Sequence, residues 1–249
     1  MYTGSIRCFL CAIFLAGLTA PAARNAEKEN GRDKITNRDV GAAFNFFSIE
    51  QQIALGRQVA YEVERQARIV TDPVISEYVN RIAQKLVRNS AAKLFLTVKV
   101  IDSREINAFA LPGGFFFVDT GLILNADNEA EMAGLMATRM AAPLTFREFS
   151  ANTESEADLL GLKYMYKAGY NPTAFVDFLE KMQSIEKPRP GSFSIHPPGD
   201  DRIKAAQQNI QRYLKEKPIY VLNTSEFEHI KVRTIGLRNI RVVHAETSR

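Results

Sequence analysis

One continuous stretch decides the fold: INAFALPGGFFFVDTGLILNADNEAEMAGLMATRMAA, residues 106–142. INAFA and FFFVD are apolar runs on either side of Leu111-Pro-Gly-Gly114, and this pattern predicts two strands around a tight turn. A helix then begins at Asp127 or Asn128, with Glu131 as the capping-box partner, and ends before Pro143. The stretch therefore predicts strand, turn, strand and helix in succession.

The segments before this stretch predict two helices and a further strand. Ser48 and Gln51 form a capping box that opens a helix through about Ala67, and Asp72-Pro73 starts a second helix. The β-branched and aromatic run LFLTVKVI, residues 94–101, predicts the strand.

The segments after it predict three more helices and two terminal strands. Thr153 with Glu156 caps a helix that runs to Gly169, Asn171-Pro172 opens the next, and the last runs from about Asp200 to Leu214. PIYVLNT and HIKVRTI, within residues 217–249, predict terminal strands followed by a tail. The predicted fold class is α+β, a small central sheet flanked by helices.

The N-terminal segment predicts export. Residues 1–22 combine Arg7, the apolar run CFLCAIFLAGL and the small residues Ala20-Pro21-Ala22, as a cleaved signal peptide does; the alternative is an uncleaved membrane anchor. No lipoprotein signal precedes Cys8 or Cys11, so we expect a secreted or periplasmic product. Both cysteines lie inside the signal, so the mature chain would contain no disulfide or cysteine metal site. Residues 23–45 are polar and aperiodic and predict a flexible lead-in.

Composition places the chain among ordinary globular proteins. It has 249 residues, 46% hydrophobic and 24% charged, enough for one full core. The net charge of +4 comes from Lys and Arg spread along the whole chain without a basic stripe. We therefore expect no nucleic-acid partner, and contact with a membrane that is peripheral at most.

Six motifs carry a resemblance to a known family. In order they are IEQQIALGRQVAYEVE, DPVISEYVNRIAQKL, VIDSREINAFALPGGFFFVDTGLI, NEAEMAGLMA, ESEADLLGLKYMYKAGYNP and SIHPPGDDRI. They resemble the gluzincin metallopeptidase family M48, which includes the CAAX prenyl endopeptidase and secreted bacterial proteases that survey outer-membrane assembly. The resemblance implies a zincin-like metallopeptidase domain over residues 46–216.

The family's chemistry depends on a motif that this chain lacks. In HExxH, two histidines one helical turn apart bind Zn²⁺ and the glutamate acts as general base on the zinc-bound water. The resemblance places this motif on residues 138–142, which read TRMAA. Thr138 is a weak zinc ligand, Arg139 cannot abstract a proton, and Ala142 offers no donor atom. We therefore expect no bound metal or other cofactor and no catalytic residue.

The other family positions survive in the sequence. Glu154 and Asp158 match ExxxD, in which the family's glutamate binds zinc and the aspartate orients a histidine; His196 and Arg202 match later positions near the cleft. Glu154 and Asp158 could instead be first-turn residues favoured by the helix dipole. A further hypothesis is that Arg139 replaces zinc as the positive partner of Glu154. For His196 the alternative is an ordinary loop residue, and for Arg202 the start of a helix. Only PLTFREFSANT separates Ala142 from Glu154, where active relatives have several tens of residues.

The segment INAFALPGG, which includes Asn107, Ala108 and Phe109, resembles the peptide-binding strand and turn of the family. Family proteases align a peptide along this strand by backbone pairing, which requires an exposed edge; the alternative is an internal hairpin.

Three interpretations of the protein's function follow from the sequence. The leading one is a secreted non-catalytic relative that binds a peptide or protein in the cell envelope. The second is an active metallopeptidase with a non-standard zinc site formed by Glu154, Glu156, Asp158 and His196. The third is a structural or decaying protein.

Overall fold

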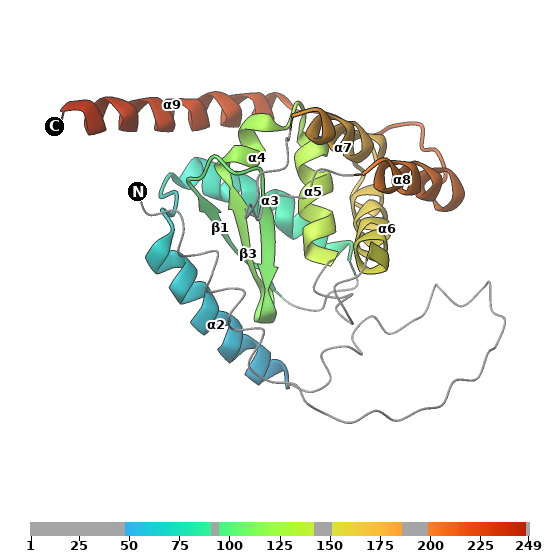
Figure 1. The fold of residues 1–249 in the computed structure, drawn as a ribbon, viewed down its shortest axis with the longest axis horizontal. Coiled ribbons are helices and arrows are strands. Elements are labelled where there is room, and N and C mark those ends of the chain that lie inside the picture. The colour runs from blue at the N-terminus through green and yellow to red at the C-terminus, as the bar shows by residue number, and fades with distance from the viewer. Residues whose placement is uncertain (1–47, 91–94, 142–150, 186–198, 248–249) are drawn as a thin grey trace.

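The structure, a computed structural model, describes residues 48–90, 95–141, 151–185 and 199–247, with all side chains in these ranges except those of 151–154 and 240–247. The signal peptide predicted at 1–22 and the lead-in at 23–45 lie outside the described residues. The predicted α+β class is confirmed: a small sheet lies between helix α2 on one face and further helices on the other (Figure 1). Within the described residues, no helix has the length and apolar character needed to cross a membrane.

The sheet has three strands in the order β1-β3-β2. Strand β1 (Thr97–Ile101) pairs in parallel with β3 (Phe115–Asp119), and β3 pairs antiparallel with β2 (Ala108–Leu111). The turn η2 (Pro112–Gly114) joins β2 to β3, as the sequence predicts. Gly113 and Gly114 have φ values of 75° and 88°, which an L side chain rarely adopts, so this tight turn requires both glycines.

Side chains alternate between the two faces of the sheet. Phe109, Leu111 and Phe117 face helix α2 (Ile49–Gln66), together with Ala60 and Val63 of that helix. The opposite face, with Ala108, Phe116 and Val118, belongs to the main core formed with helices α3 (Pro73–Arg88) and α5 (Glu129–Ala141). The two-residue period of a strand thus divides the core into a small and a large cluster.

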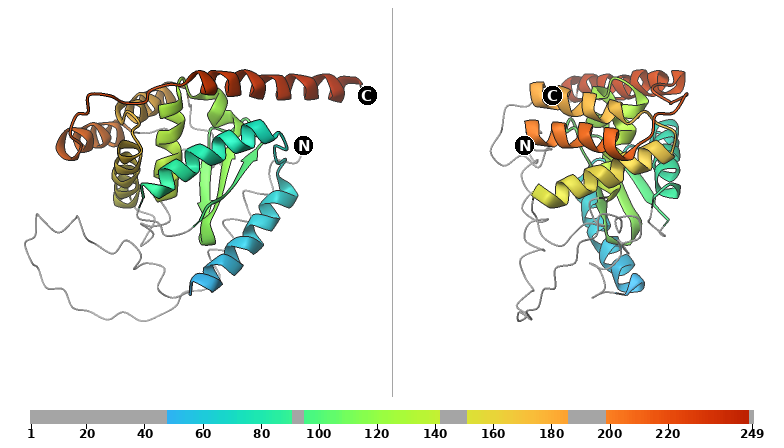
Figure 2. Two further views of the ribbon diagram at one scale, coloured as in Figure 1. Left: turned by 180° about the vertical axis from the view of Figure 1, so that it is seen from behind. Right: turned by 90° about the vertical axis from the view of Figure 1, so that its right-hand side faces the viewer.

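Helices α6, α7 and α8 complete the large core on the side of the sheet away from α2. Helix α5 follows the short helix α4 (Thr120–Asn125) and contacts α6 (Ala151–Lys167) and α7 (Thr173–Ile185); helix α8 (Asp200–Tyr213) contacts α6 and α7 in turn. Figure 2 shows α6, α7 and α8 grouped at the end of the molecule away from α2. The sequence did not predict α4.

The helix caps test the local predictions. Ser48 and Gln51 form the predicted capping box, with Gln51 N 3.3 Å from Ser48 Oγ and Ser48 N 2.8 Å from Gln51 Oε1. At α5, Asn128 Oδ1 accepts from Glu131 N at 2.9 Å, so Asn128 caps the helix, while Glu131 Oε2 accepts from the backbone N–H of Asp127, one residue earlier, at 2.9 Å. The cap predicted at Thr153 is wrong, because α6 already begins at Ala151 and places Thr153 inside its first turn.

The C-terminal strands predicted within 217–249 are wrong. HIKVRTI lies inside helix α9 (Ser225–Thr247), and PIYVLNT forms only an isolated bridge, between Val221 and Tyr170. The alternation of HIKVRTI is real, but Phe227, Ile230 and Thr234 are buried at helical spacing. Thr224 Oγ1 accepts from Phe227 N at 3.1 Å and starts the helix. Helix α9 runs over the edge of the body and beyond it (Figure 1).

Candidate functional site

Helix α5 carries the positions at which the sequence predicts a lost zinc motif. Thr138 is buried and its hydroxyl donates to the carbonyl of Leu135 at 2.9 Å, so it bonds within its own helix. Arg139 lies in the next, partly buried position. Ala142 lies outside the described residues. The donors therefore do not suit zinc, since a helix-bonded hydroxyl and a guanidinium replace an imidazole and a carboxylate.

Helix α6 packs directly against this part of α5. A Cβ atom on Gly161 would lie 2.5 Å from Thr138 Cγ2 and 2.7 Å from Thr138 Cα. Gly161 follows the ExxxD stretch on α6 and has no Cβ, so the two helix backbones come close at Thr138. The motif position at 138 thus lies in a helix interface.

The carboxylate of Asp158 binds a cationic side chain. Arg202 Nε lies 2.8 Å from Asp158 Oδ2, and Arg202 Nη2 lies 3.0 Å from Asp158 Oδ1. Asp158 is buried in the third turn of α6, so it is not the first-turn residue that the dipole interpretation assumed. The pair joins α6 to α8, and a bidentate guanidinium occupies both carboxylate oxygens. The sequence singled out both residues but did not pair them.

Two other predicted residues lie outside what the structure describes. The backbone of Glu154 lies in α6, but its side chain is not described, and His196 lies in the segment 186–198. The predicted pairing of Arg139 with Glu154 therefore stays a prediction. In the described part of the chain, no three His, Cys, Asp or Glu side chains are grouped so that they could hold a metal ion.

Asn107, Ala108 and Phe109 lie at an edge of the sheet. Strand β2 pairs with β3 on one side, and among the described residues no strand lies on its other side. The bond from Asp119 N to Asn107 O, at 3.0 Å, fixes the ladder so that Ala108 and Ala110 occupy non-hydrogen-bonded positions. Their N–H and C=O groups therefore point away from β3. At the other edge, Val70 N and Arg68 O bond to residues 100 and 102, beside β1.

A buried carboxylate that the sequence did not single out lies at the start of α5. Glu129 accepts from Tyr78 Oη at 2.8 Å, from Tyr170 Oη at 2.7 Å and from the Thr224 hydroxyl. Burial, reinforced by the charge of Glu129, raises the pKa of both phenols above the usual range, so they remain donors. The partners come from distant segments, and no short motif could reveal them.

Asp119 is a second buried acid that the sequence did not single out. It ends β3 and is 5% exposed. Burial, together with the charge of Glu105, raises its pKa to about 8, while Arg238 acts in the opposite direction. Arg238 reaches this corner from α9 and donates to Thr120 Oγ1 at 2.9 Å.

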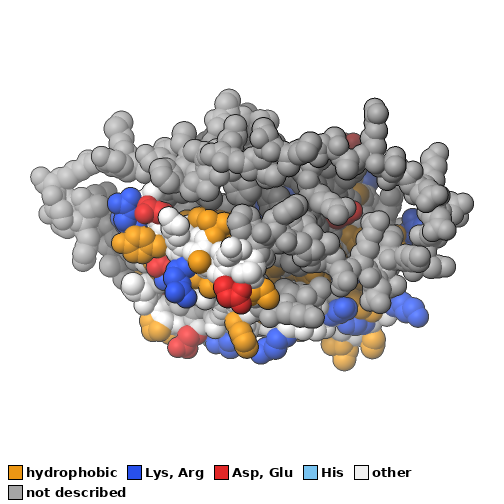
Figure 3. All heavy atoms as spheres, turned by 90° about the horizontal axis from the view of Figure 1, so that it is seen from below, with side chains coloured by type: hydrophobic (Ala, Val, Ile, Leu, Met, Phe, Trp, Pro, Cys, Tyr) orange, Lys and Arg blue, Asp and Glu red, His pale blue; other side chains and the backbone are white. Residues whose placement is uncertain are grey.

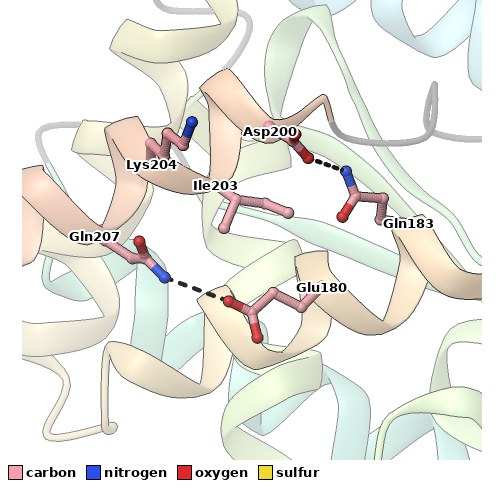
Figure 4. Close-up of a pocket in the computed structure, with 6 residues that line it drawn as sticks. All are labelled: Glu180, Gln183, Asp200, Ile203, Lys204 and Gln207. Carbon is pink, nitrogen blue, oxygen red and sulfur yellow. Dashed lines mark hydrogen bonds between the residues drawn. The ribbon is translucent and has the colours of Figure 1, made fainter.

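A pocket between α7 and α8 contains none of the predicted site residues (Figure 4). Gln183 Nε2 donates to Asp200 Oδ1 at 2.6 Å and Gln207 Nε2 donates to Glu180 Oε1 at 3.3 Å, so polar groups of one helix bind those of the other. Ile203 lies between these two bonds. The arrangement holds the two helices together, and we assign no ligand to it.

Comparisons with known proteins identify the family. The sequence model of peptidase family M48 matches residues 73–141 and 135–210. The beta-barrel assembly-enhancing protease of Escherichia coli (strain K12) is 25% identical over 284 residues, covering 92% of this chain and 56% of that protein. The putative beta-barrel assembly-enhancing protease of Vibrio cholerae is 24% identical, covering 83% and 52%. Metalloprotease LoiP of Escherichia coli is 26% identical, covering 65% and 82%.

The chain spans about half the length of the first two of these relatives. The family match, in contrast, covers more than half of this chain and includes helices α3 to α7, the sheet and most of α8. It includes both the position of the altered zinc motif and the Asp158 and Arg202 pair. The chain therefore belongs to peptidase family M48, as a member in which TRMAA stands where the family has HExxH.

Proposed function

We propose that this protein is a non-catalytic M48 relative that binds an extended segment of another protein along the outer edge of β2. The observation that carries the proposal is that, among the described residues, β2 pairs only with β3, so that the N–H and C=O groups of the partly exposed Ala110 point away from the sheet. A guest strand would bond to these groups by β-augmentation, which needs no catalyst.

The side chains beside this edge favour an apolar guest. Ala108 is 1% exposed and belongs to the main core, so a guest would lie chiefly beside the partly exposed Ala110 and Phe109. On the face toward α2, Phe109 stacks on Phe117 with ring centroids 5.1 Å apart, and an aromatic or β-branched guest residue would extend this stack. β-Barrel strands carry apolar residues at alternate positions and can therefore supply such a residue beside Phe109.

The names of the relatives suggest where such guests occur. Two of them are named for enhancing β-barrel assembly, and we propose that this chain binds unassembled barrel segments in the cell envelope. An export signal at 1–22 would bring the chain to that compartment.

The absence of catalysis is part of the proposal. Arg139 stands where the family has its general base, and a guanidinium stays protonated. The alternative, a peptidase with a non-standard zinc site, would need the Asp158 carboxylate, whose two oxygens bind Arg202. No observation favours that alternative.

The test uses the full chain and a fluorescent peptide with the alternating sequence of a barrel strand. Ala110→Pro removes an outward N–H without removing a bond to β3, and we expect about ten-fold weaker binding in fluorescence anisotropy, the loss of about one hydrogen bond. Ala110→Ser keeps the N–H and serves as the control. Equal affinities of the two variants would show that the edge does not bind the peptide.

A second measurement addresses catalysis. We expect elemental analysis of the purified protein to find far less than one zinc per chain, and the peptide to remain intact during incubation. One zinc per chain together with chelator-sensitive cleavage would overturn the non-catalytic part of the proposal. It would leave the binding result standing.

A further inference from the structure

The fold brings two basic and tyrosine-rich segments together that are separate in the sequence. They are residues 163–167 of α6 and residues 212–220, from the last turn of α8 onward. Helices α6 and α8 are in contact and lie side by side in both views of Figure 2. We call the solvent-facing side chains of these two segments the tyrosine-lysine patch.

Contacts between tyrosine rings and cations hold the two segments together. Lys163 Nζ lies 5.4 Å from the ring centroid of Tyr213, and Lys217 Nζ lies 3.8 Å from that of Tyr166. Lys217 Nζ also donates to Tyr166 O at 2.7 Å. The rings of Tyr166 and Tyr220 are 6.4 Å apart. The basic side chains are therefore ordered on an aromatic support.

The charge of the patch is strongly positive. The two segments contain five Lys and Arg residues, at positions 163, 167, 212, 215 and 217, against the single acid Glu216. On the face of the molecule in Figure 3, by contrast, basic, acidic and apolar side chains of the described residues are interspersed. Scanning the sequence missed this concentration, because the two segments lie far apart in the chain and only the fold joins them.

Apolar side chains accompany the positive charge. Ile219 is 83% exposed, Leu222 47% and Tyr213 40%. An exposed isoleucine would gain no free energy from contact with the phosphates of a nucleic acid. It gains free energy when it enters the boundary between lipid headgroups and acyl chains. Tyrosine and lysine, with polar ends on apolar stems, suit the same boundary.

We propose that the tyrosine-lysine patch docks the protein on a membrane surface rich in anionic lipid headgroups. Lys and Arg bind the headgroup phosphates, and Ile219 with Tyr213 enters the interface. The attachment is peripheral and reversible, because electrostatic attraction to anionic lipids supplies most of it and salt screens that attraction.

The test is co-sedimentation of the full chain with vesicles of phosphatidylglycerol and phosphatidylcholine, compared with vesicles of phosphatidylcholine alone. We expect binding to the anionic vesicles only, and its loss at high salt. The double variant Lys167→Glu and Lys215→Glu should bind at least about ten-fold more weakly, since each basic residue near an anionic surface contributes on the order of 1 kcal/mol. Ile219→Ser should also weaken binding while leaving the charge unchanged.

The matched control reverses the same number of charges elsewhere. Arg57 on α2 and Arg104 between β1 and β2 are exposed, and Arg57→Glu with Arg104→Glu should leave vesicle binding close to that of the unaltered chain. Equal losses in both double variants would mean that net charge alone drives binding and would overturn the proposal. Unchanged binding of the patch variant would overturn it as well, and would point to another segment such as residues 1–22. Binding to single-stranded nucleic acid without binding to vesicles would assign the patch to a different partner and refute the membrane proposal.

Discussion

Arg202 binds Asp158 through two hydrogen bonds of 2.8 and 3.0 Å, and this pair joins α6 to α8 beside the altered zinc motif. Asp158→Ala would leave the guanidinium of Arg202 partly buried without its carboxylate, and we expect a loss of about 3–5 kcal/mol in the free energy of unfolding. Urea denaturation would measure it.

The control for this pair is the double variant Asp158→Leu with Arg202→Met. It removes both charges and should recover most of the loss, because an apolar pair of similar volume carries no buried charge. Additive effects of the two single substitutions would contradict a direct interaction between them.

Gly161 should not tolerate a side chain. The new Cβ in Gly161→Ala would lie 2.7 Å from Thr138 Cα, a backbone atom that cannot move aside, so the helices must separate. We expect the free energy of unfolding to fall by an amount at or above the upper end of the range of about 1–3 kcal/mol that overpacked cores show. Gly236→Ala in α9 is the matched control: no atom lies within 4 Å of its new Cβ, and the change should stabilise the helix by up to about 1 kcal/mol. Thermal unfolding of both variants would show whether the signs differ.

Asp119 should make the stability depend on pH. Its pKa is about 8 in the folded chain and near 3.8 without the fold, so the folded state binds the proton more tightly. Stability from this group is therefore greatest at low pH and declines as the pH rises from about 4 to about 8. Asp119→Asn should remove that decline, which unfolding curves at several pH values would reveal. In Glu105→Gln the decline should begin at the same pH but end at a lower pH, because Glu105 raises the pKa of Asp119 in the folded chain. A variant whose pH profile matches the unaltered chain would refute this assignment.

Glu129 should contribute to stability through its acceptor oxygens. Glu129→Ala leaves the hydroxyls of Tyr78, Tyr170 and Thr224 without their shared acceptor, and each buried donor left unsatisfied costs about 1–3 kcal/mol. Glu129→Gln keeps one acceptor oxygen and should lose less. Urea denaturation compares the two; a loss in the Gln variant that equals or exceeds the loss in the Ala variant would contradict a stabilising role for the retained acceptor oxygen.

The sequence predicted those parts of the fold that local signals determine. The capping box at Ser48, the helix cap at Asn128 and the glycine turn at 112–114 depend on neighbouring residues, and the structure has them as expected. The strand predicted at HIKVRTI is wrong, because its alternating pattern is typical of a strand. The structure forms helix α9 there, in which Phe227, Ile230 and Thr234 are buried against helices that are distant in the sequence.

The candidate site divides in the same way. The family resemblance located Thr138, Asp158, Arg202 and the β2 edge. The pairing of Asp158 with Arg202 joins residues 44 positions apart, and only the packing of α8 on α6 reveals it. Nothing in the local sequence distinguishes Glu129 or Asp119 from ordinary surface acids, because their burial depends on segments far away in the chain.

The hydroxyls around Glu129 come from residues 51, 41 and 95 positions away from it. Forming such contacts closes long loops, which costs conformational entropy. Thr224 is the last of the three donors along the chain, so a chain shortened before residue 224 would have one donor fewer at this carboxylate. The start of α9 therefore supplies both the last donor to Glu129 and the buried ring of Phe227, so the stability of the core depends on the chain being whole to this helix.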